Sequence, residues 1–252
     1  MADSPLRTVL ARARRLARPA KVVSAVHRRE FEWRLARLPL QPIGELEDVG
    51  SHYGGWIVPV DRITRDWTCY SIGAGADVTF DLELARRFGA RVRSFEPVEL
   101  YVQMAREAGA GVERFSAHHA AIALEDGAIE MQHSHEARSG SLSAAGLYES
   151  PDSTTVPGRT IPSLMQEFGD SSVELLKVDV EGLEYDLLPA LDFEAMGVQV
   201  LTVQVHHNRR VADVRKLLAG LRDVGFVLVG NRPTIKLTLV RTPPASRQER
   251  AG

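Results

Sequence analysis

The 252-residue sequence has almost no cysteine, no long hydrophobic run and almost no net charge. Its single cysteine, Cys69, excludes an intramolecular disulfide and a zinc site built from several cysteines, and it favours a reducing, cytoplasmic setting. No apolar run approaches the roughly 18 residues that span a bilayer. The net charge of -2 provides no overall positive field of the kind that attracts nucleic acid. We therefore expect an intracellular protein with no nucleic-acid partner.

Positive charge is nevertheless concentrated at the N-terminus, where residues 1–37 hold ten Lys or Arg against three acidic residues. Apolar positions between residues 6 and 37 recur at helical spacing and are interrupted at Pro19, which predicts two short basic helices. Such a segment either caps the main domain or contacts an anionic membrane or an acidic partner. We expect a basic helical segment at 1–45, a main domain at 46–242 and a disordered tail at 243–252.

From residue 67 onward, short apolar runs alternate with amphipathic stretches, which is typical of βα units and a largely parallel sheet. The last two runs are only five residues apart, too few for a crossover helix, so they should form an antiparallel hairpin. Glycines near the helix ends should close those helices in a left-handed conformation. The expected strands are 68–72, 91–95, 112–117, 173–178, 198–205, 226–229 and 235–240; the helices are 78–88, 98–108, 161–168, 184–191 and 212–221; the glycines are Gly89, Gly109, Gly169 and Gly220.

Two segments interrupt this alternation. Residues 121–133 predict a small hairpin that turns at Glu125-Asp126-Gly127. Residues 134–158 are rich in Ser, Gly, Thr and Pro, and we expect a long loop that is mobile or covers the functional site.

The first predicted strand runs into a glycine turn, Ser71-Ile72-Gly73-Ala74-Gly75. Because Gly73 and Gly75 lack a Cβ, the backbone there can approach a ligand closely. Ligands of open α/β sheets bind beyond the carboxyl ends of the strands. Glu96 ends the second strand, close to the spacing at which an acidic residue meets the two hydroxyls of a ribose. The turn and Glu96 together predict an adenosine-type cofactor on a Rossmann-like sheet.

Two further residues distinguish among adenosine cofactors. The pyrophosphate of a dinucleotide usually meets a third glycine, and this chain has Val78 at that position. Asp77, at the start of the following helix, would repel a pyrophosphate but could pair with the ammonium group of a methionine. S-adenosylmethionine contains adenosine and no phosphate, so we expect it in preference to NAD.

Downstream, the fourth strand of the expected sheet leads into Leu175-Leu176-Lys177-Val178-Asp179-Val180-Glu181-Gly182-Leu183-Glu184. This block is similar to the Lys-Ile-Asp-Val-Glu-Gly-Ala-Glu signature of the FkbM family of S-adenosylmethionine-dependent methyltransferases. Further similarities lie at Phe95-Glu96-Pro97 and at 120–127, 139–142 and 160–164, so the resemblance covers roughly residues 67–207. The chain departs from the family pattern at Ser71, where the family usually has Asp, and at Gln204, where it often has Glu.

The resemblance implies a Rossmann-like class I methyltransferase sheet, mostly parallel with an antiparallel last strand. It also implies O-methylation of a hydroxyl on a sugar, a glycolipid or a natural product. Two alternatives stay open: a noncatalytic protein that keeps the cofactor-binding fold and serves a partner, and an NAD-dependent oxidoreductase. The predicted cofactor-binding residues are Gly73, Gly75, Asp77, Glu96, Pro97, Ala121 and Asp179.

Acidic and imidazole side chains at the expected strand ends are candidates for a general base. Asp179 and Glu181 follow the fourth strand, and His206 and His207 follow the fifth. Because the ordinary pKa of histidine, about 6.5, suits a base near neutral pH, we predict that His206 is the base and that Asp179 orients substrate or cofactor. Asp179, Glu181 and His206 could instead hold a divalent metal that acidifies the hydroxyl, but we favour a site without metal.

Overall fold

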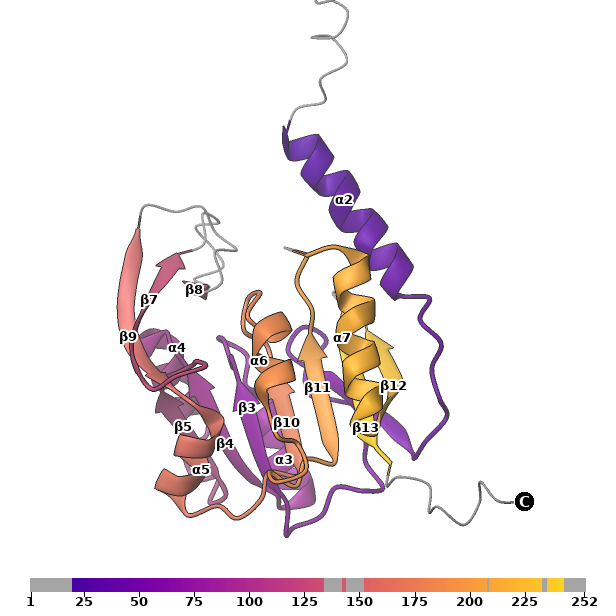
Figure 1. Cartoon of the computed structure of the whole chain (residues 1–252). Coiled ribbons are helices and arrows are strands. Elements are labelled where there is room, and N and C mark those ends of the chain that lie inside the picture. The colour runs from indigo at the N-terminus through magenta and orange to yellow at the C-terminus, as the bar shows by residue number, and fades with distance from the viewer. Residues whose placement is uncertain (1–19, 134–141, 144–151, 208, 233–234, 243–252) are drawn as a thin grey trace, which may run out of the picture.

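The computed structural model describes residues 20–133, 142–143, 152–207, 209–232 and 235–242. A central seven-stranded sheet lies between two layers of helices, and two smaller sheets flank it (Figure 1). Strand order in the central sheet is β12-β13-β11-β10-β3-β4-β5. Its strands are β3 (Thr68–Ile72), β4 (Arg91–Glu96), β5 (Phe115–His119), β10 (Leu175–Val178), β11 (Val200–Gln204), β12 (Phe226–Arg232) and β13 (Lys236–Arg241).

Pairing in the central sheet agrees with the expected mostly parallel arrangement. The five strands from β5 to β11 pair in parallel, and β13 pairs antiparallel with both β11 and β12. The antiparallel hairpin predicted for the last two strands is therefore confirmed. The last strand lies inside the sheet, between β11 and β12, and not at its edge.

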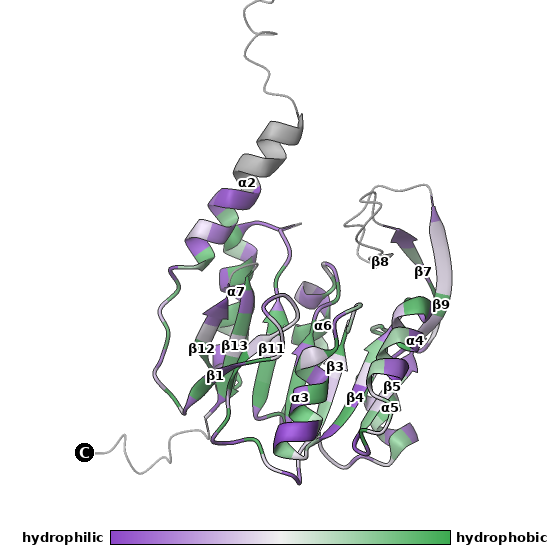
Figure 2. Cartoon of the chain, turned by 180° about the vertical axis from the view of Figure 1, so that it is seen from behind, coloured by the Kyte–Doolittle hydropathy of each residue, from purple (hydrophilic) through white to green (hydrophobic). Residues whose placement is uncertain are grey.

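Alternating side chains of the strands fill a hydrophobic core on each face. Along β3, Tyr70 and Ile72 pack with the helices α5 (Ile161–Phe168), α6 (Glu184–Ala190) and α7 (Val211–Asp223). Cys69 points to the opposite core, which α3 (Thr79–Phe88) covers. The period of two along each strand places successive side chains on opposite faces. Figure 2 shows the apolar character of the strands between the helical layers.

The small sheet beside the parallel edge corrects two predictions. It contains β6 (Ala121–Ile122), β7 (Gly127–His133), β8 (Leu142–Ser143) and β9 (Ser153–Arg159), in the order β6-β9-β7-β8. The hairpin predicted over 121–133 is wrong, because β9 pairs with both β6 and β7 and separates them. Residues 153–158 likewise form a strand within the predicted loop. The rest of that loop lies outside the described residues, apart from Leu142, Ser143 and Asp152.

Several element ends also differ from the expectations. The strand predicted at 112–117 begins at Phe115, because the chain first turns after α4 (Glu99–Ala108), with Gly111 at φ 81°. Gly89 and Gly169 close their helices in the left-handed conformation as predicted. Gly109 ends α4 at φ −87°. Gly220 lies inside α7, which continues to Asp223 before Gly225 adopts φ 95°.

The N-terminal segment contributes one described helix, α2 (Ala20–Leu35), and the first predicted helix lies outside the described residues. Phe31 and Leu35, near its end, are buried in the same core as α7. In Figure 1, the parallel strands of the central sheet point upward, and α2 extends upward beyond that end of the sheet. No helix in the described ranges is long and apolar enough to cross a membrane. Contact with an anionic membrane or an acidic partner stays a prediction.

Candidate active site

The glycine turn joins the carboxyl end of β3 to α3 and packs directly against the end of β10. Gly73 and Gly75 have φ values of 71° and 63°, in the left-handed region that favours glycine. A Cβ on Gly73 would lie 1.8 Å from the backbone oxygen of Asp179, whereas a Cβ on Gly75 would meet no atom within 4 Å. Gly73 is therefore required by the packing of the two strands, and Gly75 borders open space.

Glu96 holds the glycine turn from the neighbouring strand. Its side chain is buried, and its two carboxylate oxygens accept hydrogen bonds from the backbone N–H groups of Gly75 (2.8 Å) and Val98 (2.9 Å). Burial raises the pKa of Glu96, although those two bonds and the nearby Lys177 oppose the shift. Each oxygen can accept a further hydrogen bond, so the carboxylate can hold the turn and still receive a hydroxyl donor.

Asp77 fixes the loop between β1 (Leu46–Val49) and β2 (Trp56–Pro59) to the start of α3. It accepts hydrogen bonds from the Ser51 hydroxyl (2.5 Å) and from the Thr79 N–H (3.0 Å). Burial alone raises the pKa of Asp77, but the bonds from Ser51, Thr79 and Gly54 outweigh it and lower the pKa. Asp77 is thus engaged within the protein, and its pairing with a cofactor ammonium stays a prediction.

Pro97 and Ala121, also predicted to contact the cofactor, lie just beyond the ends of β4 and β5. The backbone oxygen of Pro97 is 2.9 Å from Nε2 of His119, and Ala121 is buried in β6. The N–H of Ala120 donates to the backbone oxygen of Glu96, which ties the two strand ends together. Both residues therefore lie past the carboxyl ends of the parallel strands, close to Glu96, where the cofactor is predicted to bind.

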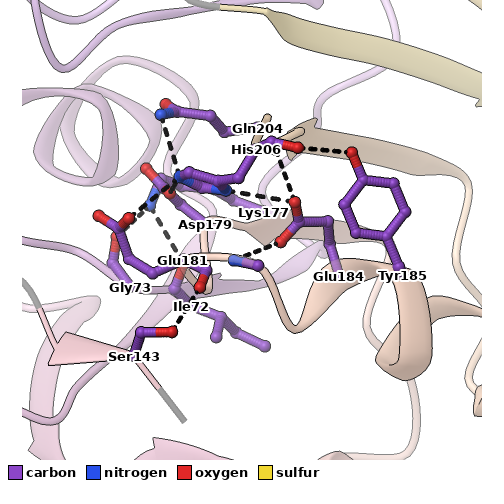
Figure 3. Close-up of polar contacts among 11 residues, drawn as sticks. Ile72, Gly73, Ser143, Lys177, Asp179, Glu181, Glu184, Tyr185, Gln204 and His206 are labelled. Atoms are coloured by element: carbon purple, nitrogen blue, oxygen red, sulfur yellow. Dashed lines mark hydrogen bonds and ion pairs between the residues drawn. The ribbon is translucent and has the colours of Figure 1, made fainter. Parts of the chain in front are cut away.

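Asp179, Glu181 and His206 converge beside the glycine turn (Figure 3). Nε2 of His206 lies 3.3 Å from Oε2 of Glu181 and 3.7 Å from Oδ1 of Asp179. Asp179 does not cap α6, whose N-cap residue is Leu183. Its Oδ1 is buried and accepts no hydrogen bond from the described residues. Asp179 and His206, the candidate catalytic pair, are thus brought together, and Oδ1 of Asp179 is free to accept a hydrogen bond.

Glu184, a residue that the sequence analysis did not assign to the site, positions His206. Its side chain is fully buried; Oε1 accepts the backbone N–H of His206 (2.7 Å), and Oε2 accepts the N–H of Gly182 (2.9 Å). Oε1 also lies 3.2 Å from Nδ1 of His206, so the ring directs Nε2 toward Asp179 and Glu181. The hydroxyl of Tyr185 donates to the backbone oxygen of His206 (2.7 Å), visible in Figure 3.

The acidic surroundings change the expected protonation of His206. Burial lowers its pKa, but Glu181, Glu184 and Asp179 outweigh burial and raise the pKa well above 6.5. Burial raises the pKa of Asp179, against the opposing effects of His206 and Lys177. The ordinary histidine pKa, on which the prediction of a neutral base depended, does not apply in this environment.

Comparison with known proteins identifies the family. The model of the methyltransferase FkbM domain matches residues 48–228, most of the chain. The chain belongs to the FkbM methyltransferase family. It is therefore a methyltransferase of the class that uses S-adenosylmethionine, and the resemblance seen in the sequence is confirmed. No curated protein matches the chain.

Among solved structures, the FkbM chain is similar to several proteins of low sequence identity. The fibrillarin pre-rRNA processing protein of Methanococcus jannaschii is 12% identical, with 71% of this chain and 68% of that chain covered and a TM-score of 0.42. A human methyltransferase 10 domain containing protein is 10% identical, with coverages of 73% and 74% and a TM-score of 0.42. The N-terminal domain of human METTL16 in complex with SAH is 10% identical, with coverages of 70% and 61% and a TM-score of 0.41.

The residues of this FkbM domain fit the adenosine cofactor that the family implies. The open space beside Gly75, the buried carboxylate of Glu96 and the exposed edge of the glycine turn together provide room and a hydroxyl acceptor. Lys177 supports the turn from beneath, because its ammonium donates to the backbone oxygens of Gly73 (2.7 Å) and Ile72 (3.3 Å). S-adenosylmethionine would thus be held by Gly73, Gly75 and Glu96.

Ser71, where the FkbM family usually has Asp, lies beside a buried acid from another element. Asp81 of α3 is 1% exposed, and its Oδ2 accepts a hydrogen bond from the Ser94 hydroxyl (3.0 Å). Burial raises the pKa of Asp81, while Lys177, Ser71 and Ser94 favour its charged form. A carboxylate is therefore present under the glycine turn, supplied by the helix and not by β3.

Two further residues of the site come from the β1–β2 loop and from β13. Tyr53 is 83% exposed, and its partial burial, together with the charges of Asp179 and Glu181, raises its pKa. The ammonium of Lys236 donates to the backbone oxygen of Tyr53 (2.7 Å). Tyr53 and Lys236 are far in sequence from the block at 177–184. The one sequence signal for this part of the site is Lys236, a charged residue at the start of an apolar strand.

Proposed function

We propose that this protein transfers the methyl group of S-adenosylmethionine to a hydroxyl of a sugar, a glycolipid or a natural product. The observation that carries the proposal is the position of Asp179. Its buried Oδ1 accepts no hydrogen bond from the described residues, and its backbone oxygen packs against Gly73 of the cofactor turn. A hydroxyl that donates to this oxygen would lie next to the cofactor, because the glycine turn and Asp179 are in contact.

The chemistry requires little more than orientation and removal of one proton. S-adenosylmethionine supplies the methyl group on a positively charged sulfur. The acceptor oxygen forms a bond to that carbon as the carbon–sulfur bond breaks, and the hydroxyl proton passes to the carboxylate of Asp179, next to His206. Orientation of two reactants can contribute about 7 to 11 kcal/mol, and proton transfer to a positioned group contributes a further factor of about 100 to 10,000. Asp179 and His206 are the proposed catalytic residues.

Tyr53 supports a carbohydrate-like acceptor. The residue is 83% exposed, its backbone oxygen is held by Lys236, and burial followed by the charges of Asp179 and Glu181 raises its pKa. An aromatic ring offers an apolar face to the C–H groups of a sugar, and its hydroxyl offers a polar edge. We propose that Tyr53 contacts the acceptor beside the point of methyl transfer.

Product analysis with isotopically labelled cofactor and a panel of glycosides tests this function. We expect label on a hydroxyl oxygen. The Asp179→Asn change should lower kcat at least 100-fold because it removes a carboxylate at the acceptor. Tyr53→Phe, as a matched control, keeps the aromatic face, and Tyr53→Ala should raise KM with little change in kcat.

Calorimetric titration with S-adenosylhomocysteine shows whether each variant keeps the cofactor site. Both Tyr53 variants and Asp179→Asn should bind this product within a few-fold of the parent protein. Label found only on nitrogen or carbon acceptors would contradict O-methylation, and tight binding of NAD without binding of S-adenosylhomocysteine would contradict the methyltransferase cofactor itself.

A further inference from the structure

The cluster of Asp179, Glu181 and His206 has the composition and spacing of a metal site. One ligand atom from each side chain lies within 4.8 Å of the others. In the described part of the chain, no other group of three His, Cys, Asp or Glu side chains converges in this way. Ligands arranged around one Mg²⁺ or Mn²⁺ at about 2.1 Å are separated by roughly 3 to 4 Å. The separations of 3.3 and 3.7 Å from Nε2 of His206 fall in this range.

The unpartnered oxygen of Asp179 is a second, independent observation. The buried carboxylates of Glu96, Asp170 and Glu184 all have hydrogen bonds to both oxygens. Asp179 differs, because its buried Oδ1 accepts no hydrogen bond in the described residues and lies 3.7 Å from Nε2 of His206, beyond hydrogen-bond distance. Such an atom carries a desolvation cost that a bound cation would offset.

Nearby ammonium groups do not fill that role. Lys177 donates to the backbone oxygens of Ile72 and Gly73, and Lys236 donates to those of Tyr53 and Gly55. Asp81 has a comparable buried oxygen without a partner, but it belongs to no group of converging ligands in the described residues. The combination of converging ligands and an unsatisfied oxygen is thus specific to Asp179.

Glu184 supplies the outer support that a metal-bound histidine usually has. A ligating imidazole commonly donates its other N–H to a carboxylate, which fixes the ring and its orientation. Here the buried Glu184 lies 3.2 Å from Nδ1 of His206 and leaves Nε2 facing the other two ligands. The tautomer follows from these partners and not from observed hydrogens.

Backbone geometry presents Glu181 to the same point. Glu181 has φ 48°, a left-handed conformation that costs about 1 to 2 kcal/mol for a residue with a Cβ, and Gly182 follows at φ 102°. The Ser143 hydroxyl donates to the backbone oxygen of Glu181 (2.7 Å), so β8 holds this turn from outside (Figure 3). The turn brings the Glu181 carboxylate back over the end of β10, next to His206.

We propose that Asp179, Glu181 and His206 bind one divalent metal ion, with Glu184 orienting His206. Two carboxylates suit Mg²⁺ and Mn²⁺, and the imidazole favours Mn²⁺ over Mg²⁺. This proposal revises the expectation of a metal-free site. Its chemical role rests on the proposed function: with the ion bound, the acceptor oxygen would contact the ion in place of a direct hydrogen bond to Oδ1 of Asp179, and its proton would be easier to remove before methyl transfer.

Titration with Mn²⁺, followed by electron paramagnetic resonance, tests binding without relying on activity. The full chain is first freed of metal with a chelator, and loss of the free Mn²⁺ signal then reports the bound ion. We expect one equivalent to bind, Glu181→Gln to weaken binding at least tenfold, and Glu184→Gln to weaken it about 10- to 100-fold. Glu194→Gln is the matched control, because Glu194 is exposed and pairs with Arg241 and not with any of the three proposed ligands.

Binding of S-adenosylhomocysteine by each variant shows that the protein remains folded. Equal Mn²⁺ affinity in the parent and Glu181→Gln, or no bound Mn²⁺ in the parent, would overturn the metal proposal. The outcome is separable from that of the proposed function. Methyl transfer to a hydroxyl that persists in chelator would support O-methylation and contradict the metal proposal. Glu181-dependent Mn²⁺ binding without methyl transfer to any hydroxyl would support the metal proposal and contradict O-methylation.

Discussion

Two carboxylates on the same edge of the sheet differ in how the protein satisfies them. Glu96, on the proposed cofactor side, accepts backbone hydrogen bonds at both oxygens from Gly75 and Val98. Asp179, on the proposed acceptor side, has one buried oxygen that accepts no hydrogen bond from the described residues. Both oxygens of Glu96 are used within the glycine turn, whereas Oδ1 of Asp179 can still accept a hydrogen bond or bind a cation.

This difference suggests that Glu96 positions the cofactor and that Asp179 takes part in the reaction. A carboxylate that accepts two backbone hydrogen bonds fixes the shape of the turn before any ligand arrives, which reduces the ordering cost of binding. An unsatisfied oxygen is costly unless a substrate or cation meets it. Functional sites commonly keep such departures from a fully satisfied structure. We therefore expect changes on the cofactor side to act on affinity, and changes around Asp179 to act on turnover.

The largest expected effect comes from adding a side-chain atom at Gly73, where the glycine turn contacts the backbone of Asp179. Gly73→Ala would place a Cβ 1.8 Å from the Asp179 backbone oxygen, so we expect at least about 3 kcal/mol loss of unfolding free energy and no measurable binding of S-adenosylhomocysteine. Urea denaturation and calorimetry measure the two quantities. Gly75→Ala is the control: its Cβ meets no atom, so only the left-handed φ should cost stability, about 1 to 2 kcal/mol. Equal destabilisation by the two changes would contradict this account.

A smaller effect should follow when Glu96 loses one of its two acceptors. In Glu96→Gln, the amide group would face either the Gly75 or the Val98 N–H and could not accept its bond. We expect affinity for S-adenosylhomocysteine to fall roughly 10- to 100-fold, equivalent to about 1.4 to 2.7 kcal/mol. Calorimetry measures the change, and Glu99→Gln, an exposed neighbour at the start of α4, should leave affinity unaltered. An unchanged affinity in Glu96→Gln would remove Glu96 from the cofactor site.

The smallest effect is expected at Asp77, whose bonds are local. Asp77→Asn should cost about 1 kcal/mol of unfolding free energy near neutral pH and should lower cofactor affinity less than Glu96→Gln does. The folded-state pKa of Asp77 is lowered, so the charged group stabilises the fold above its unfolded pKa of about 3.9. That contribution is lost as the pH falls through the folded pKa. Thermal unfolding from pH 7 to 3 should show the parent and variant converge below about pH 4, and a constant difference would contradict the assignment.

Much of the cofactor side was predictable because it is built from neighbouring residues. A strand, two glycines and a helix start follow one another along the chain, and a left-handed φ at Gly73 and Gly75 is a local requirement that glycine meets. The spacing to Glu96 follows from the length of one βα unit. The proposed acceptor side was less accessible. Glu184 ends the block that resembles the family signature, but its contact with His206, like the approach of Tyr53, depends on segments distant in sequence.

By itself, the sequence determined the alternation of strands and helices, the hairpin of β12 and β13, the glycine turn and the family. Those features depend on side-chain periodicity and on backbone preferences that act over a few residues. Only the tertiary structure decided that β9 separates β6 from β7, that Asp81 supplies a carboxylate beside Ser71, and that Glu184 directs His206 toward Asp179. The physical reason is that pairing partners and buried charges depend on which segments meet in space, and the periodicity of one segment contains no information about its distant neighbour.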